Sequence, residues 1–154
     1  MMNRSFFLLF LLFGLASAMV HLLCMHYKAF ETDYECGATG YFLADGWPYC
    51  YRFTRSMIDK FDSTGKEFIG CTIPCMVNSL RGYLKKNDIH SCSQIADAAY
   101  EQRVHCYAAC DFCTAWLTNT DAFMSVYDVG DISTFASLKD VGGILNGCTD
   151  GTLE

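Results

Sequence analysis

The chain has 154 residues, a net charge of −6 at neutral pH, and hydrophobic residues at 52% of its positions. Such a length suits a single domain with a core of ordinary size. An acidic chain lacks the electrostatic footprint of a protein that binds DNA, RNA or anionic lipid. We therefore expect no nucleic-acid partner, and small molecules or other proteins fit better.

The first 18 residues have the layout of a secretory signal peptide. Arg4 supplies positive charge, residues 6–15 form an almost unbroken apolar run, and the small residues at 16–18 suit a signal peptidase. The run is too short for a membrane span, and no later stretch reaches the ~20 apolar residues that a span needs. An uncleaved N-terminal anchor is the alternative. We predict a signal peptide over 1–18, secretion to the extracellular space, and one disulfide-rich domain over 19–154.

All ten cysteines lie after the predicted signal peptide. An even, high count in an exported chain indicates a framework of disulfides, and five bridges would use every thiol. A zinc site around Cys110, Cys113 and His105 is the alternative, which export disfavours. We predict no metal and no cofactor. The candidate bridge-forming residues are Cys24, Cys36, Cys50, Cys71, Cys75, Cys92, Cys106, Cys110, Cys113 and Cys148.

In chain order, residues 19–46 are rich in Gly, Tyr and Asp and predict an irregular lead-in, with one short helix over 22–29 at most. The sequence Asp45-Gly46-Trp47-Pro48 is a helix start signal, because Asp can cap a helix and Pro is tolerated in its first turn. Apolar residues then recur at helical spacing and predict a helix over about 48–61.

The stretch from Asp62 to Gly65 interrupts this pattern and offers new N-caps. The broad apolar face that follows predicts a helix from about Lys66 to Lys85. Pro74 lies inside it and removes one hydrogen bond, so we expect a bent helix, with two shorter helices as the alternative.

Ser91 or Ser93 would cap the next helix, which we expect to end near Cys113. The stretch 119–121 would cap a shorter helix, and the tail has only weak helical signals around 133–138. No alternating run predicts a strand. The predicted fold class is all-α, a disulfide-stapled helical domain.

Two cysteine pairs, 71/75 and 106/110, are spaced four residues apart, so on helices each pair lies on one face. If the two helices pack antiparallel, two residues face each other when their numbers add up to the same total as those of the neighbouring pair. This relation holds for 71 with 110 and for 75 with 106. The geometry favours these two bridges and an antiparallel helix hairpin. Local pairing of Cys71 with Cys75 is poor, because their Cβ vectors run parallel. Many other pairings stay open.

One part of the chain, roughly residues 36–148, resembles the stanniocalcins. The resemblance rests on Lys60-Phe61-Asp62 followed by Gly65-Lys66 and Phe68-Ile69, on Cys50 and Phe53 before this stretch, and on Cys75 seven residues after Phe68. The Cys106-Tyr107 pair and the intervals of 14, 7 and 35 residues between the later cysteines are also similar. The cysteines that carry these intervals are Cys92, Cys106, Cys113 and Cys148.

The resemblance implies the bridges Cys36–Cys92, Cys75–Cys106 and Cys113–Cys148, and it implies Cys24–Cys50 as a fourth. Cys71 and Cys110 have no counterpart in the family pattern, but they fall where an antiparallel helix pair would bring them together. The late cysteine of the stanniocalcin covalent dimer and the glycosylation sequon of the mature chain have no equivalent here. We therefore predict neither a covalent dimer nor N-glycosylation.

No polar cluster has the layout of an active site, so we predict that the chain is not an enzyme. A catalytic pair of His105 with Glu101 or Asp111 is less favoured than a surface histidine, and the other histidines, His21, His26 and His90, are scattered. The acidic residues Asp121, Asp128 and Asp131 lack the ligand order of a calcium loop and are expected to be solvated.

Aromatic residues crowd into 27–53, and they either cover the core or form a partner surface or an apolar pocket. They are Tyr27, Phe30, Tyr34, Tyr41, Phe42, Trp47, Tyr49, Tyr51 and Phe53. The resemblance implies a secreted stanniocalcin-like signalling or regulatory protein that acts on a protein partner, and this is the predicted function. It would be hormone-like, with control of calcium and phosphate, or an inhibitor of an extracellular metalloproteinase of the pappalysin type. The alternative is a secreted helical carrier of a small apolar ligand.

Overall fold

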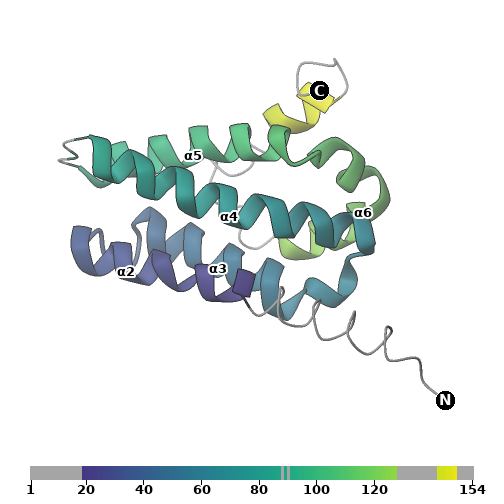
Figure 1. Cartoon of the computed structure of the whole chain (residues 1–154), viewed down its shortest axis with the longest axis horizontal. Helices are drawn as coiled ribbons and strands as arrows, with labels where there is room; N and C mark the ends of the chain where they lie inside the picture. The colour runs from purple at the N-terminus through teal and green to yellow at the C-terminus, as the bar shows by residue number, and fades with distance from the viewer. Residues whose placement is uncertain (1–18, 88, 90, 128–141, 149–154) are drawn as a thin grey trace.

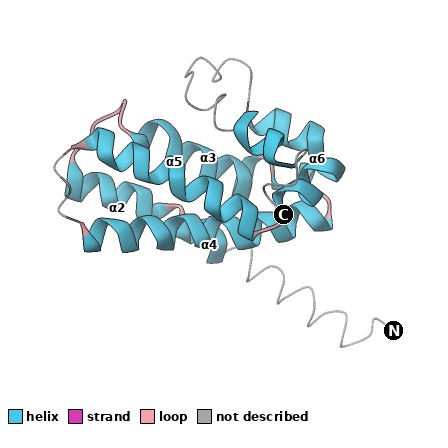
Figure 2. Cartoon of the chain, turned by 90° about the horizontal axis from the view of Figure 1, so that it is seen from above, coloured by secondary structure: helices cyan, strands magenta, loops and turns pink. Residues whose placement is uncertain are grey.

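The computed structural model describes residues 19–87, 89, 91–127 and 142–148, and in this part of the chain it contains helices and loops but no strand (Figure 2). The all-α prediction is therefore confirmed. The three longest helices are α4 (Ser63–Lys86), α5 (Cys92–Ala109) and α6 (Phe112–Val126). In Figure 1, α4 lies between α5 and the N-terminal segment that contains α2 and α3.

The N-terminal segment is more helical than the sequence predicted. Residues 19–23 are helical, and α2 (Met25–Tyr34) follows directly. The expected short helix over 22–29 is therefore present within a longer helical stretch, whereas the expectation of an irregular lead-in is wrong. Tyr27 and Phe30 are buried along α2. Burial of this aromatic face stabilises a helix whose isolated sequence has weak propensity.

The predicted helix over 48–61 is present as a chain of short helical pieces. A π-helical turn, η1 (Phe42–Gly46), leads into α3 (Trp47–Tyr51), and a second π-helical turn, η2 (Arg52–Ser56), precedes the 3-10 turn η3 (Ile58–Lys60). Asp45 does not cap this helix, because the chain is already helical before it. Its carboxylate instead accepts a hydrogen bond from the Tyr100 hydroxyl, at 2.9 Å.

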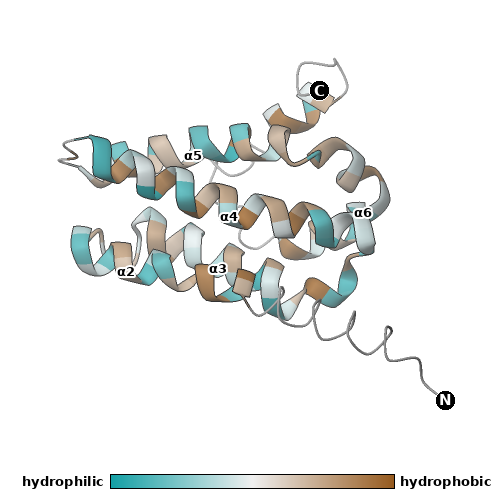
Figure 3. Ribbon diagram, in the orientation of Figure 1, coloured by the Kyte–Doolittle hydropathy of each residue, from teal (hydrophilic) through white to brown (hydrophobic). Residues whose placement is uncertain are grey.

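α4 is a single helix that continues through Pro74, so the alternative of two shorter helices is wrong. Asp62 is its N-cap, as the sequence indicated, and the Asp62 Oδ1 atom accepts from the Gly65 N–H at 2.9 Å. Hydrophobic and hydrophilic residues alternate along α4 in Figure 3, as an amphipathic helix requires.

The end of α5 differs from the prediction. The helix stops at Ala109 rather than near Cys113, because Asp111 adopts the left-handed conformation, with φ of 57°, and breaks the helical path. Asp is one of the few residues that tolerate this region. The cap of α5 is Ser91, whose hydroxyl accepts from the Gln94 N–H at 3.3 Å.

α6 contains the two segments that the sequence separated. Asn119 has non-helical dihedrals, with φ of −128°, inside an otherwise helical stretch, so the predicted cap is a kink within one helix. The expected helical signals at 133–138 lie outside the described residues, whereas residues 142–148 form a further helical segment.

The aromatic core joins α4, α6 and η2. Phe123 has no exposed surface, and its ring centroid lies 5.1 Å from that of Phe61 and 5.6 Å from that of Phe68. Phe53 and Phe112 approach the same ring at 6.0 and 5.3 Å. Edge-to-face contacts of this kind add to the free energy gained from burying the rings.

A reciprocal hydrogen-bonded contact holds the start of α4 against the kink of α6. The Asp62 N–H donates to Asn119 Oδ1 at 2.8 Å, and Asn119 Nδ2 donates to Asp62 Oδ1 at 2.8 Å. The Gly65 N–H and then the Asn119 amide lower the pKa of Asp62, which therefore stays ionised. The contact leaves no room for a side chain at Gly65, where a Cβ atom would lie 2.6 Å from a Phe61 ring carbon and 2.8 Å from Asn119.

We predict opposite effects for alanine at different glycines of α4. Gly65→Ala should lower the free energy of unfolding by about 1–3 kcal/mol, because the methyl group overpacks the contact between Phe61 and Asn119. Gly70→Ala and Gly82→Ala are the matched controls, since a Cβ at either glycine meets nothing within 4 Å. These two should stabilise the helix by up to about 1 kcal/mol. Urea unfolding of the three variants measures the difference, and equal effects at all three would contradict the close contact.

Candidate functional site: a disulfide framework around a buried cavity

The structure joins the ten cysteines in five bridges, and no cysteine is free. The pairs are those that the sequence analysis favoured or that the resemblance implied. Their Cα atoms lie 5.4–5.8 Å apart, within the usual range for a disulfide. The bridges are Cys24–Cys50, Cys36–Cys92, Cys71–Cys110, Cys75–Cys106 and Cys113–Cys148.

Two of these bridges join α4 to α5 one helical turn apart. Cys71 and Cys75 lie one turn apart in α4. Cys75 is bridged to Cys106 in α5, and Cys71 is bridged to Cys110, the residue directly after α5. Each of the other bridges brings in a different segment. Cys24–Cys50 ties α2 to α3, and Cys36–Cys92 ties the end of the α2 segment to the start of α5. Cys113–Cys148 ties α6 to the helical residues 142–148.

A charged residue lies in the core beside this framework. Arg103 stands on the inner face of α5 and is only 4% exposed, with its guanidinium 5.1 Å from the ring centroid of Tyr100. Burial alone would lower the pKa of Arg103, but the phenol oxygens of Tyr41, Tyr107 and Tyr127 raise it above its ordinary value. The guanidinium therefore stays charged inside the protein.

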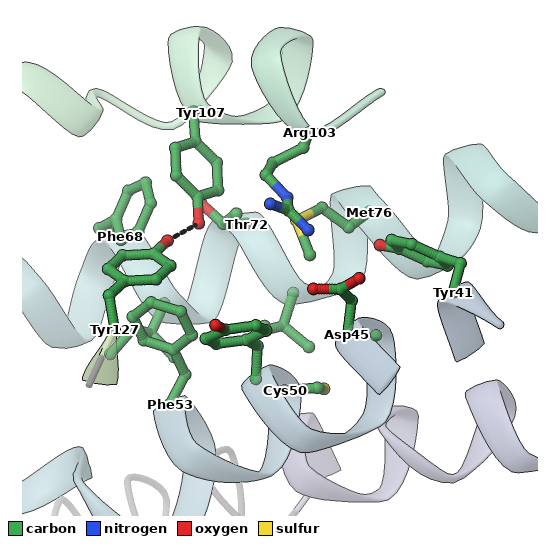
Figure 4. A pocket seen from close by; sticks show the side chains of 14 residues that line it. Tyr41, Asp45, Cys50, Phe53, Phe68, Thr72, Met76, Arg103, Tyr107 and Tyr127 are labelled. Carbon is green, nitrogen blue, oxygen red and sulfur yellow. Dashed lines mark hydrogen bonds between the residues drawn. The ribbon is translucent and has the colours of Figure 1, made fainter. Parts of the chain in front are cut away.

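Asp45 faces the same space from η1. It is 7% exposed, and Figure 4 shows its carboxylate and the Arg103 guanidinium pointing toward one another. Burial and the Asp45 carboxylate raise the pKa of Tyr100, so that this phenol keeps its proton and donates to Asp45. A second pair of phenols, Tyr107 and Tyr127, is hydrogen-bonded at 2.6 Å nearby.

A small cavity between α3, α4 and α5 is lined by Asp45, Arg103, Tyr107 and Tyr127, among others. The cavity has a volume of about 20 Å³, which is room for a water molecule, whereas pockets for drug-sized ligands measure ~300–1,000 Å³. Thr72 also lines it, and its buried hydroxyl has no hydrogen-bond partner among the described residues. The cavity is thus a water-sized space that is lined mostly by apolar surface, with Arg103 and Asp45 among its lining residues.

The family comparison agrees with this architecture. A scan against protein-family models matched the stanniocalcin family over residues 15–154. The chain belongs to the stanniocalcin family. Comparisons with curated proteins and with solved structures found no match.

The motif that carries the stanniocalcin resemblance has a structural role at each of its distinctive positions. Phe61 and Phe68 enter the aromatic core, Asp62 caps α4 and binds Asn119, and Gly65 allows that contact. These positions therefore explain the fold of the chain rather than a reaction.

The structure separates the other candidate residues of the sequence analysis. His105, Glu101 and Asp111 are exposed and share no hydrogen bond in the described part of the chain, and Asp121 is exposed too. His90, Asp128 and Asp131 lie outside the described residues. Among the residues that the structure describes, there is no group of three or more metal-ligating side chains, and no helix is long and apolar enough to cross a membrane.

Most of the aromatic residues crowded into 27–53 pack in the core. Tyr27, Phe30, Tyr41, Phe42 and Phe53 are buried, whereas Tyr34, Trp47 and Tyr49 are partly buried and Tyr51 is 41% exposed. The segment thus divides into a core-facing set and a smaller surface set.

Sequence reasoning missed Arg103 as a special residue. It lies on the apolar face that Ile95, Ala99 and Cys106 define, and a cation in such a stripe was the available signal. Nothing in the sequence indicates that Asp45 would be the buried acid opposite it, because the two residues are 58 positions apart.

We predict that the two bridges between α4 and α5 are strongly redundant. Once Cys75–Cys106 has closed the loop, Cys71–Cys110 removes little further entropy from the unfolded chain. Replacing either pair with alanine should therefore cost much less than half of the loss on replacing both, which we expect to be about 2–5 kcal/mol. Guanidinium unfolding of the three variants measures this, and additive losses would contradict it. Peptide mapping of the parent protein should first recover all five pairs.

We also predict that Arg103 and Asp45 are energetically coupled. Arg103→Met should lower the free energy of unfolding by about 1–3 kcal/mol, because it removes the cation that the buried phenol oxygens and the Asp45 carboxylate face. Adding Asp45→Asn should recover part of this loss by removing the unpaired charge. Unfolding in urea of both single variants and the double variant gives the coupling energy. A coupling energy near zero would mean that the two charges do not act on each other.

Proposed function

We propose that this chain is a secreted, hormone-like regulatory protein that acts by contact with an extracellular protein partner. Membership of the stanniocalcin family over residues 15–154 carries the proposal. Members of this family are secreted hormones rather than enzymes. The partner would be a receptor or a proteinase of the pappalysin type, in keeping with the activities that the family resemblance implied.

The disulfide framework supports the extracellular part of the proposal. Disulfides persist in oxidising compartments, and this chain commits ten cysteines to five bridges within itself. Since no thiol is left over, we expect no disulfide-linked dimer. We propose that residues 1–18 are removed as a signal peptide and that 19–154 is the working domain.

The carrier alternative has less support. A carrier needs an apolar chamber of the size of its ligand, whereas the cavity beside Arg103 is water-sized and contains opposite charges. The aromatic residues that the sequence analysis considered for a pocket are largely packed against one another in the core.

Expression of the full chain in secreting animal cells tests the proposal. We expect the protein in the medium, beginning at Met19, with five bridges by intact mass. The purified protein should then inhibit substrate cleavage by a pappalysin-type metalloproteinase or change calcium or phosphate uptake by cultured epithelial cells. Reduced and alkylated protein is the matched control, because it has the same sequence without the fold.

Retention in the cells with residues 1–18 attached would contradict secretion. A folded, secreted protein without effect in either assay would contradict the regulatory role. A lipid that co-purifies with it in native mass spectrometry would favour the carrier instead.

A further inference from the structure

Four side chains from the N-terminal helices form a row on the surface. The Lys28 Nζ atom lies 3.9 Å from the ring centroid of Trp47, whose ring is 5.6 Å from that of Tyr51. Tyr51 in turn makes an edge contact with His21 at 5.7 Å. The row therefore runs along the seam between the helical residues 19–34 and α3.

Exposed apolar side chains lie beside this row. Leu22 is 64% exposed and Met25 48% exposed, and they follow each other at helical spacing. Tyr51 is 41% exposed. Aromatic residues, Met and Arg are the types enriched where proteins bind each other, and Trp and Tyr are frequent energetic centres of such contacts.

A disulfide connects the two segments that carry the row. Cys24, between His21 and Lys28 in sequence, is bridged to Cys50, between Trp47 and Tyr51. The Thr54 hydroxyl lies 3.3 Å from His21 Nδ1 and donates to the Cys50 carbonyl at 2.7 Å. The rings are thus held in place before binding, which reduces the entropy that a partner would have to overcome.

Two cations flank the row. Lys28 and the exposed Arg55 flank it, and burial together with the nearby Arg55 charge lowers the pKa of His21. Positions 21, 25, 28 and 32 on one side of the seam and 44, 47, 51 and 55 on the other contain no acidic residue. This contrasts with a chain whose net charge is −6. Glu31, three residues after Lys28, accepts a hydrogen bond from the Gly37 N–H.

We propose that this N-terminal aromatic surface is the docking site for an acidic segment of the protein partner. It comprises His21, Leu22, Met25, Lys28, Trp47, Tyr51 and Arg55. Carboxylates of the partner pair with Lys28 and Arg55, while its apolar side chains pack on Met25 and on the rings. Opposite charge steers the encounter and sets the register, and the rigid rings supply the contact area. The inference rests on the proposed function, since it assumes a protein partner.

A defined peptide tests the chemistry of this surface without knowledge of the partner. The probe is a twelve-residue peptide of alternating Glu and Leu, added to the isotope-labelled, secreted full chain and followed by amide NMR. We expect shift changes confined to residues 21–28 and 47–55. Lys28→Glu with Arg55→Glu should weaken binding by at least about tenfold, because like charges then face each other. Tyr51→Ala should weaken it as well without altering the disulfides.

Lys85→Glu with Lys86→Glu is the matched control, since it makes the same change in net charge at the exposed end of α4. It should leave binding unchanged. Equal weakening by both double variants would reduce the effect to overall charge and overturn the proposal. Shift changes centred elsewhere, or equal binding of a peptide with Gln in place of Glu, would overturn it too. Shifts at the residues of this surface that depend on protein concentration in the absence of peptide would mean that a second copy of the chain occupies the surface. This result would also overturn the proposal.

The proteinase and uptake assays separate this inference from the proposed function. If the parent protein is active and the Lys28→Glu, Arg55→Glu variant is equally active, the docking surface is wrong while the regulatory role stands. If the parent protein is inactive, the regulatory role fails, and the peptide titration still decides whether the surface selects acidic segments.

Discussion

The covalent pairing of α4 with α5 is the constraint on which the rest of the molecule depends. The bridges Cys71–Cys110 and Cys75–Cys106 fasten two long helices on consecutive turns, and this fixes both the register and the rotation of α5 against α4. With α5 held in this way, Arg103 faces inward toward η1 and Tyr107 reaches Phe68, at 5.2 Å between ring centroids. The buried cavity beside Arg103 is thus a consequence of the same register.

α4 also connects the third long helix to this pair. Its N-cap, Asp62, exchanges hydrogen bonds with Asn119 at the kink of α6, and Phe61 and Phe68 on either side of Gly65 enclose Phe123. The residues by which the chain resembles its family are therefore residues that position α6. In physical terms, the motif that identifies the family consists of a helix cap, a glycine that permits a close contact between helices, and two rings of the core.

The N-terminal segment combines two tasks. One set of its aromatic rings, including Tyr27 and Phe42, is fully buried and closes the core over α4 and α5. Another set, with Trp47 and Tyr51, remains at the surface beside Lys28, over the Cys24–Cys50 bridge. Concentration of the exposed rings and cations on one rigid seam is the reason to place partner binding there.

The sequence by itself predicted the helical class, offered Asp62 among the caps of α4 and favoured the bridges between α4 and α5, because capping and the spacing of cysteines on a helix are local rules. It did not determine that residues 19–46 would be largely helical, that Asp111 would end α5, or that Asp45 would bind Tyr100 instead of capping α3. These outcomes depend on burial and on contacts between distant residues. Only the tertiary structure decided that Arg103 and Asp45, far apart in the chain, would share one cavity, because the pairing depends on how the helices pack and not on the propensity of either segment.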